Sequence, residues 1–196
     1  MIEGEIPGYT YGTSEVAKSP LSDEAFEKLK SSVGFTDEDV QYLKLAGEIL
    51  SPQMDAVLDM WYGFLDTLPH IGFYTTDGKG NPVTEYRAAT RQRFRQWILD
   101  TCNRPYDRAW LDYQHEIGLR HHRSKKNQTD HVDSVPYTPL RYIVTFIYPI
   151  TIKFKPFLAN GNTSAENVEK MHEAWFKSMV LQVTLWSLPY TKDGDF

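Results

Sequence analysis

The sequence is poor in cysteine and in long apolar runs. Cys102 is its only cysteine, so no intrachain disulfide can form, as is usual in the reducing cytosol. The longest apolar-leaning stretch, 178–191, is shorter than the ~18 residues that a membrane-spanning helix needs. The N-terminus lacks the basic and apolar segments of a signal peptide. These absences predict a cytoplasmic protein with no membrane partner.

Positive charge is also in short supply. The 21 lysines and arginines are outnumbered by 26 aspartates and glutamates, which gives a net charge of −5. This acidic balance argues against nucleic acid as a partner. The basic run 120–126 is the exception. Such a run is usually the solvated end of a helix, but it can also pair with the carboxylates or propionates of a ligand.

Strand patterns are missing too, whereas apolar residues recur at helical spacing. The chain therefore predicts one all-α domain over 1–196, with roughly seven or eight helices in a body at 21–196. Residues 1–20 contain several glycines and prolines and are expected to form an extended arm that packs on this body. Aromatic residues make up 14% of the chain, and such side chains often line pockets for flat ligands.

Capping residues set the expected helix boundaries. Ser22, Thr36, Ser51 and Ser164 are expected as N-caps. The expected helices span 22–34, 36–50, 52–68, 82–101, 105–126, 140–157 and 164–187, with a short helical turn in the loop 69–82. Pro149 should kink the helix 140–157. That helix and the last one are apolar over more than one stripe, so each should be buried on two faces.

The stretch 105–126 carries the strongest functional signal. On one face of the expected helix lie Trp110, Gln114, Ile117 and His121. Gly118 on the same face would let a bulky group approach the backbone. An inward imidazole in an aromatic-rich helical protein suits an axial haem ligand, and apolar surroundings keep it neutral. The alternative is that His121 only complements the dipole at the helix C-terminus.

Several strings in the chain resemble the protoglobins, archaeal single-domain globins related to the globin domains of globin-coupled sensors. The longest is Glu-Ile-Gly-Leu-Arg-His-His-Arg-Ser-Lys-Lys-Asn-Gln-Thr-Asp at 116–130. Shorter ones lie at 6–12, 97–101, 110–114, 146–151 and 155–159. The resemblance implies a globin fold with an additional N-terminal helix, a haem b cofactor, binding of diatomic gases and a homodimer.

The resemblance also implies residue roles. His121 matches the proximal iron ligand. Trp61, Tyr62 and Phe94 match distal residues, and Ile117, Phe146 and Ile150 match positions that line the pocket, while Arg93 is placed to reach a propionate. Without the resemblance, Trp61 and Phe94 could be plain core residues, and Tyr62 a core tyrosine bonded to a carbonyl.

Two positions depart from the family pattern. Thr90 stands where an apolar distal residue is expected, so its hydroxyl could change the polarity of the distal pocket. His115 replaces an expected tyrosine on another helix face, and we assign it no haem role.

Three functions remain open at this stage. The first is a haem protein that binds or senses dioxygen, carbon monoxide or nitric oxide at an open sixth iron position. The second is a haem enzyme that turns over dioxygen, nitric oxide or peroxide with an external electron donor. Because no transmitter or redox domain is recognised in the chain, either function implies a separate transmitter or reductase. The third is an interaction module or a zinc site at His115, His121 and His122, although zinc usually takes four ligands.

Helices 140–157 and 164–187 are also the expected dimer contact. Their surplus apolar surface would be covered if two helices from each of two chains formed a four-helix bundle. Candidate anchors are Trp175, Phe176, Val183 and Trp186, since aromatic residues dominate interface energetics.

Overall fold

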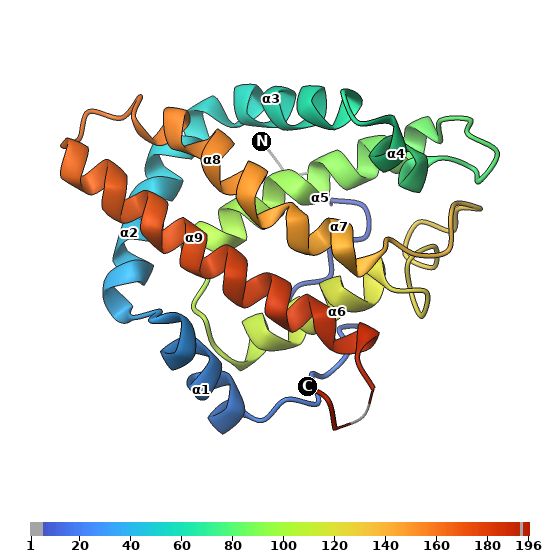
Figure 1. Cartoon of the computed structure of the whole chain (residues 1–196), viewed down its shortest axis with the longest axis horizontal. Helices are drawn as coiled ribbons and strands as arrows, with labels where there is room; N and C mark the ends of the chain where they lie inside the picture. The colour runs from blue at the N-terminus through green and yellow to red at the C-terminus, as the bar shows by residue number, and fades with distance from the viewer. Residues whose placement is uncertain (1–5, 193) are drawn as a thin grey trace.

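The computed structural model describes residues 6–192 and 194–196 (Figure 1). These residues form nine α-helices and, apart from one β-bridge between Thr76 and Pro82, no β-structure. The all-α prediction is therefore confirmed. None of the helices within the described residues is both long enough and apolar enough to cross a membrane.

The helices follow one another along most of the chain. They are α1 Asp23–Val33, α2 Asp37–Leu50, α3 Met54–Asp66, α4 Pro69–Gly72, α5 Thr84–Asn103, α6 Arg108–His121, α7 Leu140–Thr145, α8 Ile147–Leu158 and α9 Ala165–Ser187. Three short 3₁₀ turns lie at Ser51–Gln53, Phe73–Thr75 and Leu188–Tyr190. The helix count exceeds the predicted seven or eight because 69–72 forms its own turn and 140–157 divides into two helices.

Capping chemistry explains the boundaries that the sequence predicted well. The Ser22 hydroxyl accepts a hydrogen bond from the Ala25 N–H at 3.2 Å, and Gly34 ends α1 with φ +66°. Thr36 begins α2 through a capping box with Asp39. These local bonds satisfy backbone groups that a helix end leaves unpaired, so they fix the ends without help from distant residues.

The boundaries of α6 were predicted less well. Pro105 lies outside the helix, because Asp107 is the N-cap and accepts from the Trp110 N–H at 3.0 Å. The helix ends at His121 rather than 126, since His122 is extended with ψ 159°. The His121 carbonyl then accepts from the Thr138 N–H at 2.9 Å. The chain from 122 to 139 therefore returns to the end of α6 instead of extending it.

The predicted kink in 140–157 is observed as a break at Phe146, between α7 and α8. Pro149 has no N–H to donate to the carbonyl of Thr145, four residues earlier, and its ring would clash with that carbonyl. The break consequently lies three residues before the proline. It leaves Phe146 in the wall of a cavity.

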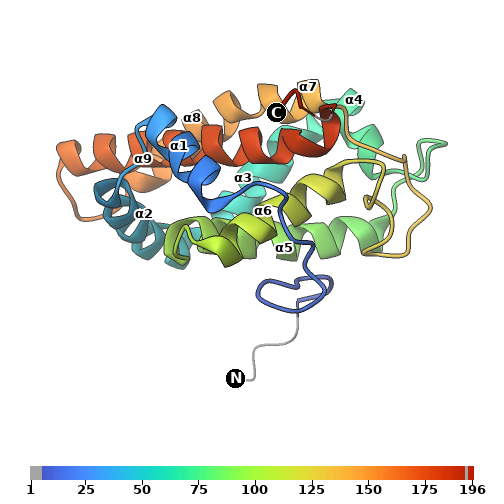
Figure 2. The same ribbon diagram turned by 90° about the horizontal axis from the view of Figure 1, so that it is seen from below.

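Helices α7, α8 and α9 lie on one side of the molecule, and α5 and α6 lie on the other (Figure 2). Large side chains that are fully buried join the two sides, among them Trp110, Phe154, Met171, Trp175 and Met179. The cavity lies between these layers and is lined by residues of α3 and α5 to α9.

Helix α9 is buried on more than one face, as predicted. Trp175 and Val183 are nevertheless buried inside the single chain, and Trp186 lines the cavity. These three were wrong as dimer anchors, because the chain's own core and cavity already surround them. Phe176 alone of the four candidates is exposed, with 46% of its surface accessible.

The N-terminal arm crosses α5 and α6 (Figure 2). Its residues 6–20 contain turns and no helix. The Tyr9 hydroxyl donates to Asp100 at 2.7 Å, and Arg120 donates to the Gly8 carbonyl and to the Thr10 hydroxyl. The prediction that the arm packs on the body is confirmed for these residues, while 1–5 lie outside the described part.

Candidate functional site

The cavity between the helix layers has a volume of about 340 Å³ and a largely apolar, aromatic lining. All eight residues singled out from the sequence contribute to it: Trp61, Tyr62, Arg93, Phe94, Ile117, His121, Phe146 and Ile150. They come from α3, α5, α6, α8 and the α7–α8 break. The fold thus gathers these distant residues around one space.

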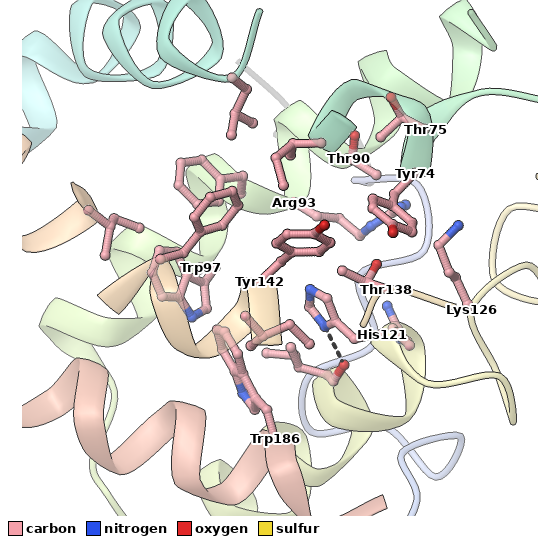
Figure 3. Close-up of a pocket in the computed structure, with 18 of the residues that line it drawn as sticks. Tyr74, Thr75, Thr90, Arg93, Trp97, His121, Lys126, Thr138, Tyr142 and Trp186 are labelled. Carbon is pink, nitrogen blue, oxygen red and sulfur yellow. Dashed lines mark hydrogen bonds between the residues drawn. The ribbon is translucent and has the colours of Figure 1, made fainter. Parts of the chain in front are cut away.

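His121 is the last residue of α6, and its ring is fixed by a single hydrogen bond. Its Nδ1 lies 2.8 Å from the Ile117 carbonyl oxygen. A carbonyl only accepts, so Nδ1 carries the proton and Nε2 keeps a free lone pair. The second ring nitrogen points into the cavity, toward Tyr142 (Figure 3). His121 is therefore presented as a metal ligand would be.

The surroundings of His121 favour its neutral form. Burial lowers the pKa of the imidazole, and the positive charges of Lys126 and Arg120 lower it further. The hydrogen bond to Ile117 offsets only part of this effect. Because iron binds the neutral imidazole, His121 can act as a ligand at a lower pH than an ordinary histidine.

Helices α6 and α9 approach closely beside His121. A Cβ added at Gly118 would lie 3.1 Å from both the Cα and the carbonyl oxygen of Trp186. The expectation that Gly118 admits a bulky neighbour is confirmed. Trp186 stacks on His121 with ring centroids 5.5 Å apart and donates its Nε1–H to Gln114 at 2.8 Å. This contact braces the imidazole from the α9 side.

We expect Gly118→Ala to lower the melting temperature. The new methyl group must push against the α9 backbone, and overpacking of this kind costs about 1–3 kcal/mol. Gly63→Ala in α3 is the matched control, because nothing lies within 4 Å of its added Cβ and alanine favours a helix by roughly 1 kcal/mol. Thermal unfolding followed by circular dichroism should move in opposite directions for the two variants. An unchanged or raised melting temperature for Gly118→Ala would contradict the close contact.

Helices α3 and α5 supply a second wall of the cavity. Trp61 stacks on Phe94 at 5.7 Å, Phe146 meets Trp61 edge-on at 5.6 Å, and Tyr62 meets Phe94 edge-on at 6.2 Å. Interlocked rings of this kind leave little freedom for rotation. The wall is therefore suited to limit both the space beside a bound ligand and the access of water.

Tyr62 is the hydroxyl-bearing aromatic of this wall. Burial raises its pKa, and the Thr90 hydroxyl and the nearby arginines only partly offset that. Arg91 and Arg87 lie over its ring at 5.2 and 5.5 Å. Tyr62 thus remains a neutral hydrogen-bond donor. Thr90 also lines the cavity, but its hydroxyl donates to the Arg87 carbonyl at 2.9 Å.

The polar side chains of the cavity are gathered on one side (Figure 3). There Figure 3 shows Tyr74, Thr75, Arg93, Lys126 and Thr138, whereas Trp97 and Trp186 lie on the other side. A haem has the same division, since its ring is apolar and its two propionates share one edge. The distribution of polar and apolar side chains around the cavity therefore fits that cofactor.

Arg93 lines the cavity, but its guanidinium is already engaged. It makes two hydrogen bonds to the Asp130 carboxylate, at 2.8 and 2.7 Å, and a third to the Pro7 carbonyl at 2.7 Å. The paired charges are thereby neutralised. A contact between Arg93 and a propionate stays a prediction.

The other two histidines of the sequence motif lie outside the cavity lining. His122 stacks edge-on against Tyr190 at 4.9 Å, with its Nδ1 3.1 Å from the Ser124 hydroxyl. His115 is half-buried, and its Nδ1 has no hydrogen-bond partner in residues 6–192 and 194–196. Among the residues that the structure describes, no three histidine, cysteine, aspartate or glutamate side chains are grouped to hold a metal ion. The zinc alternative thus gains no support.

Comparison with known families decides the relationship of the chain. The protoglobin family model matches residues 22–196, which is most of the sequence. The chain belongs to the protoglobin family. The match begins just before α1, so the arm is an extension ahead of the matched protoglobin region.

A solved structure shows the same fold. The globin domain of the Geobacter sulfurreducens globin-coupled sensor superimposes with a TM-score of 0.65 at 16% identity, covering 85% of this chain and 97% of that domain. This likeness identifies the all-α globin fold. A comparison with curated proteins finds no similar sequence.

Sequence reasoning missed several cavity residues of this protoglobin. Trp186 was interpreted as an interface residue, and Lys126 was considered only as part of the basic run 120–126, either as a solvated helix end or as a partner of ligand carboxylates. Tyr142 and Thr138 carried no signal, because they approach the cavity only through the return of the chain after α6. The aromatic content was the one available hint for Trp186 and Tyr142.

Proposed function

We propose that the chain holds haem b in this cavity, with His121 as the axial iron ligand, and binds dioxygen, carbon monoxide or nitric oxide at the open sixth position. The observation that carries the proposal is the hydrogen bond from His121 Nδ1 to Ile117, which leaves Nε2 free inside an aromatic cavity. Membership of the protoglobin family supports haem-based gas binding in general.

Each part of the lining has a role in this function. When bound, the haem would supply an iron that takes up a diatomic ligand reversibly. Ile117, Phe146 and Ile150 would contact the flat ring, since they line the apolar part of the cavity. Trp61 and Phe94 would exclude water and limit the size of the ligand. Tyr62 would donate a hydrogen bond to a polar ligand such as dioxygen. Carbon monoxide depends less on such a hydrogen bond.

We expect Tyr62→Phe to accelerate dioxygen release by about tenfold or less, which corresponds to the loss of one hydrogen bond worth roughly 0.5–1.5 kcal/mol. Carbon monoxide binding should change less. Stopped-flow kinetics of both ligands measure the difference. Thr90→Val is the companion variant. The Thr90 hydroxyl already donates to a backbone carbonyl, so its loss should change dioxygen release less. Unchanged dioxygen release in Tyr62→Phe, with faster release in Thr90→Val, would transfer the role to Thr90.

Gas binding can be distinguished from turnover by one assay. Steady-state consumption of dioxygen, nitric oxide or peroxide in the presence of an external reductant would identify an enzyme. Reversible binding without consumption supports a binder or sensor.

We infer that the protein assembles as a homodimer through α7, α8 and α9. Val144, Tyr148 and Ile152 follow at intervals of four residues and are 47%, 72% and 44% exposed. Phe176 on α9 is 46% exposed. Helices α8 and α9 lie side by side (Figures 1 and 2), so these side chains belong to neighbouring helices. A twofold contact would cover them with the same surface of a second chain.

A further inference from the structure

Lys126 is a buried cation in the wall of the cavity. Only 4% of its surface is exposed. Its Nζ donates to the Val135 carbonyl at 2.7 Å and lies farther from the Ser134 hydroxyl, at 3.4 Å, and from the Asn127 amide oxygen, at 3.5 Å. All three partners are neutral. The ammonium group is therefore withdrawn from water without an opposite charge in contact.

The other cations of the lining are neutralised. Arg93 is paired with Asp130, and Arg120 is paired with Glu116 at 2.7 Å. Within residues 6–192 and 194–196, Lys126 makes no such ion pair. Burial lowers the pKa of Lys126 to about 8, although Asp130 partly opposes the shift. A buried charge that lacks an opposite charge in contact is costly, so an anion that entered the cavity would be stabilised beside Lys126.

Thr129 provides a second, independent sign of a binding site. Its hydroxyl is buried and has no hydrogen-bond partner within the described part of the chain, although buried polar groups are nearly always bonded. It lines the same cavity, three residues after Lys126. The arm covers it, since a Cβ on Gly8 would lie 2.6 Å from the Thr129 methyl carbon. A hydroxyl in this position can donate to an anionic oxygen.

We propose that Lys126 and Thr129 form a carboxylate-binding subsite, which takes one propionate of the porphyrin and so sets its orientation in the cavity. This inference rests on the proposed function. A carboxylate accepts from both donors and brings the missing negative charge. Arg93 is a poorer primary anchor, because Asp130 and Pro7 occupy its donors. Asp130 does not repel the propionate strongly, since Arg93 neutralises it.

The test is a titration of the apoprotein with two iron porphyrins, haem b and its dimethyl ester, in which both propionates are neutral. The wild type should bind haem b more tightly by about tenfold to a hundredfold, as expected for hydrogen bonds to a charged group. Lys126→Met should lose most of this preference. Lys44→Met is the control, because it removes an equal charge from an exposed site on α2. It should keep the preference.

Lys126→Gln is a second variant in case Lys126→Met fails to fold. The glutamine amide keeps a neutral donor for the Val135 carbonyl. Thr129→Val should reduce the preference by less than either Lys126 variant. If the role of Lys126 were purely structural, its substitution would lower the affinity for both porphyrins equally. The ratio of the two affinities would then stay unchanged. A Lys126 variant with the wild-type ratio would thus overturn the subsite. Failure of the wild type to bind either porphyrin would overturn the proposed function itself, and the subsite with it.

Discussion

His121→Ala is expected to abolish stable haem binding. The substitution removes the Nε2 lone pair that the Ile117 hydrogen bond leaves free, and the cavity lining contains no second histidine among the residues that the structure describes. Titration of the apoprotein with haem, followed by the Soret absorbance, measures the loss. His122→Ala is the matched control, because that neighbouring imidazole lies outside the cavity lining and packs on Tyr190. It should bind haem as the wild type does.

Added imidazole should separate loss of the ligand from loss of the fold. In His121→Gly, free imidazole can occupy the space of the ring and restore the Soret band. Haem should also raise the melting temperature of the wild type, since a ligand in thousandfold excess over its dissociation constant stabilises by about 4 kcal/mol. His121→Ala should show no such rise at the same haem concentration. Equal Soret bands and equal thermal shifts for His121→Ala and the wild type would remove His121 as the ligand.

The double substitution Tyr148→Asp and Ile152→Asp is expected to convert a dimer into a monomer. These side chains are 72% and 44% exposed in the single chain, so charges there should leave its core intact. In a twofold contact, each aspartate would be buried against apolar surface of the other chain, which is strongly unfavourable. Light scattering at micromolar concentration should show the mass halved, with haem still bound.

Phe73→Asp is the control for this experiment. Phe73 is also an exposed apolar residue, 42% accessible, but it lies in the short turn after α4. It should leave the dimer unchanged. A wild type that is monomeric, folded and haem-loaded at the same concentration would refute the dimer. Dissociation by Phe73→Asp alone would move the interface away from α7, α8 and α9.

Local chemistry made much of the fold predictable. The caps at Ser22 and Ser164 place the starts of α1 and α9 correctly, because each bond joins residues only three apart. Pro149 predicts the break before α8, because a proline also acts on residues only a few positions away. The end of α6 was not predictable in this way. It depends on a bond between His121 and Thr138 across the returning chain, which no spacing rule contains.

The candidate site also contains residues that local spacing predicts and residues that depend on distant contacts. Helical spacing brought Ile117 and His121 to one face of α6, and the family resemblance added the residues of α3 and α5. The burial of Lys126 could not be inferred, because it arises when Ser134 and Val135 fold over it; the Ser134 hydroxyl itself donates to the Thr76 carbonyl at 2.6 Å. Periodicity showed that α9 has several apolar faces, but it could not tell which one meets the core. Trp175 and Val183 were misplaced for that reason.

The absorbance spectrum of the purified wild type, reconstituted with haem and recorded in the ferric, ferrous and carbonyl states, tests the central claim most directly. The account predicts uptake of one haem per chain, a Soret band distinct from that of free haem, and a further shift when carbon monoxide is added to the ferrous form. A folded protein whose spectrum remains that of free haem in all three states would contradict it.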